Sequence, residues 1–230
     1  MLADLALAWL ATLALSGVLV RTLPLSMGAL LVVGAVYAAI AWGILRGLRT
    51  VHAATVGSLH WTGVGPANRV TLIRVVLSLP LAALAVWPGT VGVEARSWII
   101  GLGSIALALD GLDGWLARRT GTHSPFGARF DMESDAALLM VLSLLAWRSG
   151  QVGPWVLGIG AMRYLFVAAG MAFPWLHGEL EPSLRRKIWC VVQGIALLVA
   201  LAPFTPAWIA QLACATALLG LAGSFGVDTL

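Results

Sequence analysis

The sequence carries one polar window between long apolar runs, Asp110-Gly-Leu-Asp-Gly-Trp-Leu-Ala-Arg118 and, after eight intervening residues, Gly127-Ala-Arg-Phe-Asp-Met-Glu-Ser-Asp135. Four of the chain's six aspartates lie in it. Asp110 and Asp113 are three residues apart, and Asp131 and Asp135 are four apart, so on helices each pair projects from one face. A carboxylate at membrane depth costs about 2.5–3.5 kcal/mol on insertion scales, and four together need a cation. The window therefore predicts a divalent-metal site where helices meet at the membrane.

The composition places the chain in a membrane. Its 230 residues are 60% hydrophobic and 10% charged, whereas soluble domains carry about 25% charged residues. Every span should be helical, because a helix satisfies its own backbone hydrogen bonds in lipid. We therefore expect an all-α polytopic membrane protein with about eight transmembrane helices. The apolar segments that predict them are 2–20, 25–45, 68–87, 96–117, 127–147, 153–173, 186–203 and 205–223.

Three parts are expected along the chain. Residues 1–47 form a transmembrane hairpin in which Asp4 is the only acidic residue. Residues 48–65 are a moderately polar linker that either lies along the membrane interface as a short helix or forms a loop. Residues 66–230 form a six-helix membrane domain that contains the aspartates.

Basic residues predict the orientation. The formal net charge is +4, and nothing in the sequence suggests a nucleic-acid-binding module. With a cytoplasmic N-terminus, ten basic residues lie on the cytoplasmic side, and the other side holds Arg21, Arg96 and Arg148. This places both termini and the aspartates at the cytoplasmic face. A compact chain with short loops suits a bacterial inner membrane.

The polar window resembles the signature of the CDP-alcohol phosphotransferase family of integral membrane enzymes. The shared pattern is D-x2-D-G-x2-A-R-x8-G-x3-D-x3-D, and the resemblance covers about residues 66–223. It implies transfer of a phosphatidyl-type group from a CDP-linked donor, such as CDP-diacylglycerol, to an acceptor hydroxyl, with release of CMP. It also implies two divalent metals, Mg²⁺ or Mn²⁺, and a homodimer. The metal ligands implied are Asp110, Asp113, Asp131 and Asp135, and Asp135 is also the general base.

Further positions match the nucleotide site of this family. The run Asn68-Arg-Val-Thr71-Leu-Ile-Arg74 is similar to the N-x2-T-x2-R that often opens its first core helix. An ordinary polar helix start with a snorkelling arginine explains that run equally well. Small residues let helices and nucleotide approach closely, and an arginine can pair with phosphate oxygens. The CDP-binding residues expected are Asn68, Thr71, Arg74, Asp113, Gly114, Ala117, Arg118 and Gly127.

The acceptor should contact polar groups of the later spans. A run of three cations, Arg185 to Lys187, suits a phosphorylated acceptor, although it equally suits anchoring to anionic lipid. The run from Lys187 to Gln193 partly resembles a K-x-K-T-x2-Q segment of bacterial phosphatidylglycerophosphate synthases and related cardiolipin-type members. Lys187 and Gln193 match this segment, whereas Trp189 and Cys190 depart from it. Glycerol-3-phosphate is the leading acceptor. The candidate acceptor contacts are Arg163, Arg185, Arg186, Lys187 and Gln193.

Other functions remain open. The same chemistry with inositol phosphate, serine, an amino-alcohol or phosphatidylglycerol as acceptor fits the motif. An ion-coupled transporter is a reading of another class, because carboxylates within spans also serve ion pathways. The motif, however, lies at one membrane end, whereas transporter sites lie near the midplane.

Overall fold

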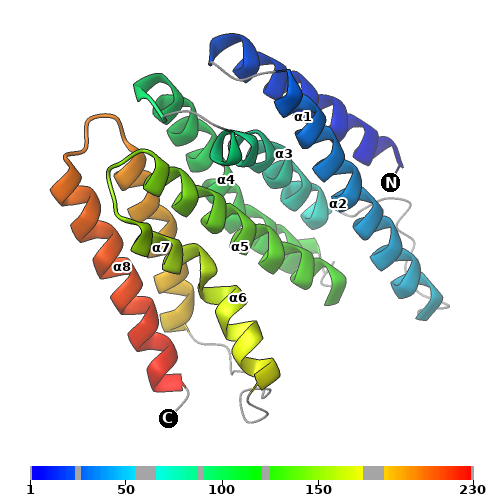
Figure 1. Cartoon of the computed structure of the whole chain (residues 1–230). Coiled ribbons are helices and arrows are strands. Elements are labelled where there is room, and N and C mark those ends of the chain that lie inside the picture. Colours follow the sequence, from blue (N-terminus) through cyan, green and yellow to red (C-terminus); the bar gives the residue numbers. More distant parts are fainter. Residues whose placement is uncertain are drawn as a thin grey trace. The chain divides into compact units, whose positions relative to one another are not determined.

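The computed structural model describes residues 2–23, 27–54, 66–87, 91–120, 125–172 and 184–228. These residues form eight α-helices and one short 3₁₀ helix, coloured along the chain in Figure 1. Among them there is no strand, which confirms the all-α expectation. The elements are α1 (Leu2–Thr22), α2 (Gly28–Ala54), α3 (Pro66–Val86), α4 (Val93–Thr120), α5 (Pro125–Arg148), η1 (Pro154–Val156), α6 (Leu157–Ala172), α7 (Leu184–Leu201) and α8 (Ala207–Asp228).

The helices identify a polytopic membrane protein. Within the described ranges, six stretches are long and apolar enough to cross a bilayer, in α1, α2, α3, α4, from η1 into α6, and in α8. Helix α7 holds a shorter apolar stretch, Ile188–Leu201. Helix α5 is long enough, but Asp131, Glu133 and Asp135 make its first half too polar to qualify by composition. The helix that carries half of the aspartate motif is thus not an ordinary span by composition.

The expected segments and the observed helices agree closely, with one extension. Helix α2 continues to Ala54, past the end of its apolar segment at residue 45. Residues 55–65, most of the expected linker, lie outside the described residues. The division into hairpin, linker and catalytic domain therefore stays a prediction.

The chain divides into two compact units, and the first comprises Met1–Pro88 and Gly101–Asp135. Its apolar cluster joins α1, α2 and α3. Inside the cluster, the Tyr37 hydroxyl donates a hydrogen bond to the carbonyl of Leu5 at 2.7 Å. Phe126 and Phe130 of α5 stack with ring centroids 6.1 Å apart and pack against the same cluster. This packing fixes the first turns of α5, where Asp131 and Asp135 lie.

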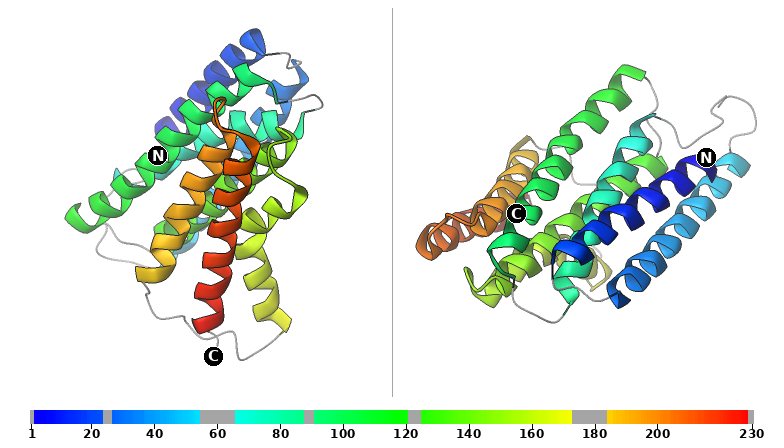
Figure 2. Two further views of the ribbon diagram at one scale, coloured as in Figure 1. Left: turned by 90° about the vertical axis from the view of Figure 1, so that its left-hand side faces the viewer. Right: turned by 90° about the horizontal axis from the view of Figure 1, so that it is seen from above.

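The second unit comprises Gly89–Ile100 and Ala136–Leu230. Helices α7 and α8 lie side by side as an antiparallel pair in Figures 1 and 2. At Gly160 of α6, a Cβ would fall inside the backbone of Met140 on α5, so these helices touch through their main chains. Arg96, on the first turn of α4, donates from Nε to the carbonyl of Leu201 at 2.9 Å and from Nη2 to that of Ala202. A buried cation thus satisfies carbonyls at the end of α7.

Candidate metal centre and active site

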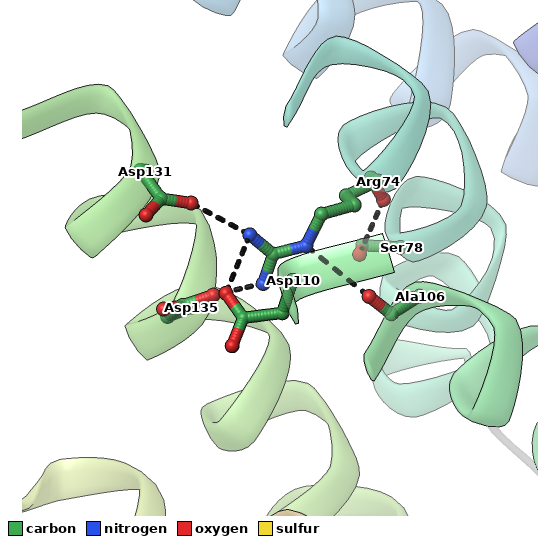
Figure 3. A network of polar contacts seen from close by, with 6 residues as sticks. All are labelled: Arg74, Ser78, Ala106, Asp110, Asp131 and Asp135. Atoms are coloured by element: carbon green, nitrogen blue, oxygen red, sulfur yellow. Dashed lines mark hydrogen bonds and ion pairs between the residues drawn. The ribbon is translucent and has the colours of Figure 1, made fainter. Parts of the chain in front are cut away.

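Three of the four motif aspartates converge in the first unit. Asp110 projects from α4, and Asp131 and Asp135 project from one face of α5 (Figure 3). One carboxylate oxygen of each lies within 4.8 Å of the other two. Their side chains are 35%, 35% and 39% exposed, so the cluster is half-buried. Asp113 is on the same helix as Asp110, but its side chain lies outside the described part of the structure.

The guanidinium of Arg74 lies between the three carboxylates (Figure 3). Nη1 is 3.0 Å from Oδ1 of Asp110 and 2.7 Å from Oδ1 of Asp131, and Nη2 pairs with Oδ1 of Asp135. Nε donates to the carbonyl of Ala106 on α4 at 3.2 Å. Arg74 is only 1% exposed, so α3 contributes a deeply buried cation to the site.

The cluster fits a divalent metal. Three carboxylates and one guanidinium have a formal charge of −2, the charge that one divalent cation neutralises. Carboxylate oxygens are hard ligands of the kind Mg²⁺ and Mn²⁺ prefer. Trans ligands of Mg²⁺ are about 4.2 Å apart, from metal–oxygen distances of about 2.1 Å. Oxygens within 4.8 Å of one another therefore need at most a small side-chain rotation to share an ion.

The other expected nucleotide contacts are only partly described. Thr71 is buried on α3, one turn before Arg74, and Asn68 is half-buried one turn earlier. Gly127 lies in the first turns of α5. The side chains of Gly114, Ala117 and Arg118 on α4 lie outside the described residues.

The expected acceptor contacts lie in the second unit. Arg163 is half-buried on α6. Arg185 donates to Ser224 on α8, from Nε to Oγ at 3.1 Å and from Nη2 to the carbonyl at 3.2 Å. Gln193 of α7 is 1% exposed, and its Nε2 has no hydrogen-bond partner among the described residues. The side chains of Arg186 and Lys187 are not described.

Two features of the site did not follow from the sequence. The motif predicts that a metal ion neutralises the aspartates, whereas the structure shows that the chain itself also supplies Arg74. The aromatic pair Phe126 and Phe130 was also missed, although its spacing of four residues within the motif was a visible signal.

Comparison with known proteins identifies a family. A family model described as CDP-alcohol phosphatidyltransferase matches residues 64–221. The match spans α3 to most of α8, contains the whole polar window and begins after α2. No solved structure matches the chain.

Proposed function

The chain belongs to the CDP-alcohol phosphatidyltransferase family, whose members are transferases, and we propose that it moves a phosphatidyl group from CDP-diacylglycerol to a small hydroxylated acceptor. CMP is the leaving group. The observation that carries this proposal is the convergence of Asp110, Asp131 and Asp135 within 4.8 Å in an apolar helical protein. Such a cluster is energetically costly in a membrane, and carboxylates at this depth therefore mark a functional site.

Two divalent cations, Mg²⁺ or Mn²⁺, are proposed to be held by Asp110, Asp113, Asp131 and Asp135. When bound, they would neutralise the negative charge of the donor's pyrophosphate and the charge that develops on the departing CMP. Asp135 is the proposed general base, which takes the proton of the acceptor hydroxyl as its oxygen attacks phosphorus and the bond to CMP breaks. Its place on α5, one turn after Asp131, supports a position beside the metals.

The CDP moiety is proposed to lie along the cytoplasmic ends of α3, α4 and α5. Thr71 is buried on α3, one turn before Arg74, and its hydroxyl suits a contact with a phosphate or a sugar. Arg118 pairs with phosphate, and the small residues allow close approach of the nucleotide. Arg74, also expected at this site, faces the carboxylates instead. The residues proposed to contact CDP are Asn68, Thr71, Asp113, Gly114, Ala117, Arg118 and Gly127.

The proposed acceptor is glycerol-3-phosphate. Gln193 supports a polar ligand near α7, because a buried amide nitrogen without a partner costs about 1–3 kcal/mol unless something accepts its hydrogen bond. Arg163, Arg186 and Lys187 are proposed phosphate contacts, whereas the bonds of Arg185 to Ser224 favour a structural role for that residue. Inositol phosphate, serine, an amino-alcohol and phosphatidylglycerol are the alternative acceptors.

A kinetic comparison tests the acceptor site. We expect Arg163→Ala and Lys187→Ala to raise the KM for the acceptor by about tenfold or more, the equivalent of one lost charged hydrogen bond. The KM for CDP-diacylglycerol should change far less. Equal changes in both constants would remove these residues from the acceptor site.

We also propose the placement of the enzyme. The site and both termini face the cytoplasm of a bacterial inner membrane, as the excess of basic residues on that side favours. The enzyme acts as a homodimer. The α1–α2 hairpin, which lies outside the family match, is a separate addition to a six-helix catalytic domain.

A CMP-release assay tests the reaction. Purified protein receives CDP-diacylglycerol, Mg²⁺ or Mn²⁺ and a panel of acceptors, with Asp135→Asn as the control. Release stimulated by one acceptor establishes the reaction and identifies the acceptor. An ion-coupled transporter, the alternative of another class, would bind metal yet release no CMP with any acceptor.

A further inference from the structure

We propose that Arg74 is a permanent counter-ion of the carboxylate site. In this role it is a positioning residue that gathers Asp110, Asp131 and Asp135 and stays beside them when metal binds. The inference rests on the proposed function, because it takes these carboxylates as the metal ligands. It assigns Arg74 to the aspartates rather than to the phosphates of the nucleotide.

The first argument is how completely the guanidinium is engaged. Nε faces the carbonyl of Ala106, Nη1 faces Asp110 and Asp131, and Nη2 faces Asp135. A guanidinium has five N–H donors in a rigid planar fork and no acceptor. All three nitrogens of Arg74 therefore already face protein oxygens, and little donor capacity remains for a phosphate.

The second argument is that the guanidinium is anchored on two sides. Its Nε is bonded to the backbone of α4, while its terminal nitrogens reach carboxylates from α4 and α5. The side chain is 2% exposed, so leaving the site would require a rotation through packed protein. Arg74 consequently links three helices and sets the distances between the carboxylates, whether metal is bound or not.

The third argument is that metal and arginine can share the same carboxylates. The ion pairs of Arg74 with Asp110, Asp131 and Asp135 all go to Oδ1 atoms. In Figure 3 the second oxygen of each carboxylate points away from the guanidinium. A carboxylate has about four lone-pair sites on two oxygens, so the Oδ2 atoms can ligate a cation while the Oδ1 atoms keep Arg74.

The experiment compares unfolding with and without Mn²⁺. Arg74→Met removes the charge at similar length, and Arg74→Lys keeps the charge but loses the fork. Without metal, in EDTA, we expect the Tm of Arg74→Met to fall by about 5–10 °C, because three carboxylates are left without their counter-ion. Saturating Mn²⁺ should restore most of this loss, so the Mn²⁺-dependent rise in Tm is larger than in the wild type. Arg74→Lys should lie between the two.

A second buried arginine gives the matched control. Arg96 is also buried, but it donates to the carbonyls of Leu201 and Ala202. The fall in Tm caused by Arg96→Met, relative to the wild type, should therefore be the same in EDTA as in Mn²⁺. If Arg74→Met behaved like Arg96→Met, the counter-ion role would be overturned. If Arg74→Met kept a wild-type response to Mn²⁺ but lost CDP affinity measured by calorimetry, Arg74 would instead be a phosphate ligand.

The test remains decisive if Arg74→Met does not fold. In that case Arg74→Lys must show a larger Mn²⁺-dependent rise in Tm than the wild type, and an equal rise overturns the proposal. A failure of the proposed function would give a different result from a failure of the counter-ion role. The wild type and Asp131→Asn would then show the same Mn²⁺ response, no metal site would exist at the carboxylates, and the inference would fail with it.

Discussion

Arg74 and Arg96 are both almost fully buried, at 1% and 6% exposure, yet their guanidinium groups face different chemistry. Arg74, in the first unit, lies among carboxylates from two helices. Arg96, in the second unit, bonds carbonyls at the end of one helix. Burial of a cation in an apolar helical protein therefore does not by itself indicate a catalytic site. The partners decide, because carboxylates retain capacity for a metal, whereas carbonyls at the end of a helix need only N–H donors.

The largest effect is expected on CMP release, from a substitution of Asp135 in the carboxylate cluster around Arg74. Asp135→Asn keeps the shape of the side chain but cannot accept the acceptor's proton, so CMP release should fall by about 10²–10⁴-fold. Binding of CDP-diacylglycerol should persist, which equilibrium binding of a labelled donor checks. Substantial residual turnover would rule Asp135 out as the base and would leave the carboxylates with metal binding only.

The aspartates of this site could be predicted because their geometry is local. Asp131 and Asp135 share one helix face whatever else the chain does, and Asp110 and Asp131 are joined by one short connection. The contact with Arg74 could not be predicted, because it joins residues 57 and 61 positions apart in the chain. Nothing in spacing or periodicity specifies which face of α3 meets α4 and α5.

The role of Arg96 shows a second limit of sequence reasoning. The sequence assigns Arg96 to the non-cytoplasmic side of the membrane as one of three basic residues there. The structure buries it against Leu201 and Ala202, residues more than 100 positions later. A count of basic residues cannot distinguish a surface cation from one that caps another helix, since capping depends on tertiary packing.

The second prediction is the converse of the first. Arg96→Met removes the side-chain donor from the carbonyl of Leu201 and leaves that of Ala202 with the N–H of Thr205, so the free energy of unfolding should fall by about 2–3 kcal/mol. In a chain of this size this is equivalent to a fall in Tm of roughly 5–10 °C. CMP release per folded molecule should stay at the wild-type value, and thermal unfolding in detergent measures the loss. Arg96→Gln, which keeps a donor, should lose less. A large loss of turnover in folded Arg96→Met would remove the contrast between the two arginines.

The third prediction concerns the close packing of α5 and α6 in the second unit, where a substitution should lower stability as Arg96→Met does. Gly160→Ala places a methyl group inside the backbone of Met140, which should destabilise the protein by about 1–3 kcal/mol. Gly158, two residues earlier on α6, is the matched control, because a Cβ there meets Leu218 at an ordinary 3.6 Å. Gly158→Ala should unfold at the wild-type temperature or slightly above it. Equal stability of the two variants would mean that α5 and α6 separate at little cost.

The smallest effect is expected at an exposed arginine–aspartate pair in the same unit as Arg74. Arg69 on α3 pairs with Asp4 on α1 at 3.1 Å, and the two side chains are 57% and 19% exposed. Solvent-accessible pairs of this kind contribute about 0.2–1 kcal/mol and are screened by salt, because water competes for both charges. Asp4→Asn should therefore change the unfolding free energy by less than about 0.5 kcal/mol and leave CMP release unchanged.

A double-mutant cycle of Asp4→Asn with Arg69→Gln, at low and high salt, isolates this pair from other effects of each substitution. The coupling should be small at low salt and should disappear at high salt. A coupling above about 2 kcal/mol that persists in salt would show that the α1–α2 hairpin holds the start of α3 in place. The hairpin would then take part in positioning Arg74, five residues further along α3, and exposure would not separate the two ion pairs.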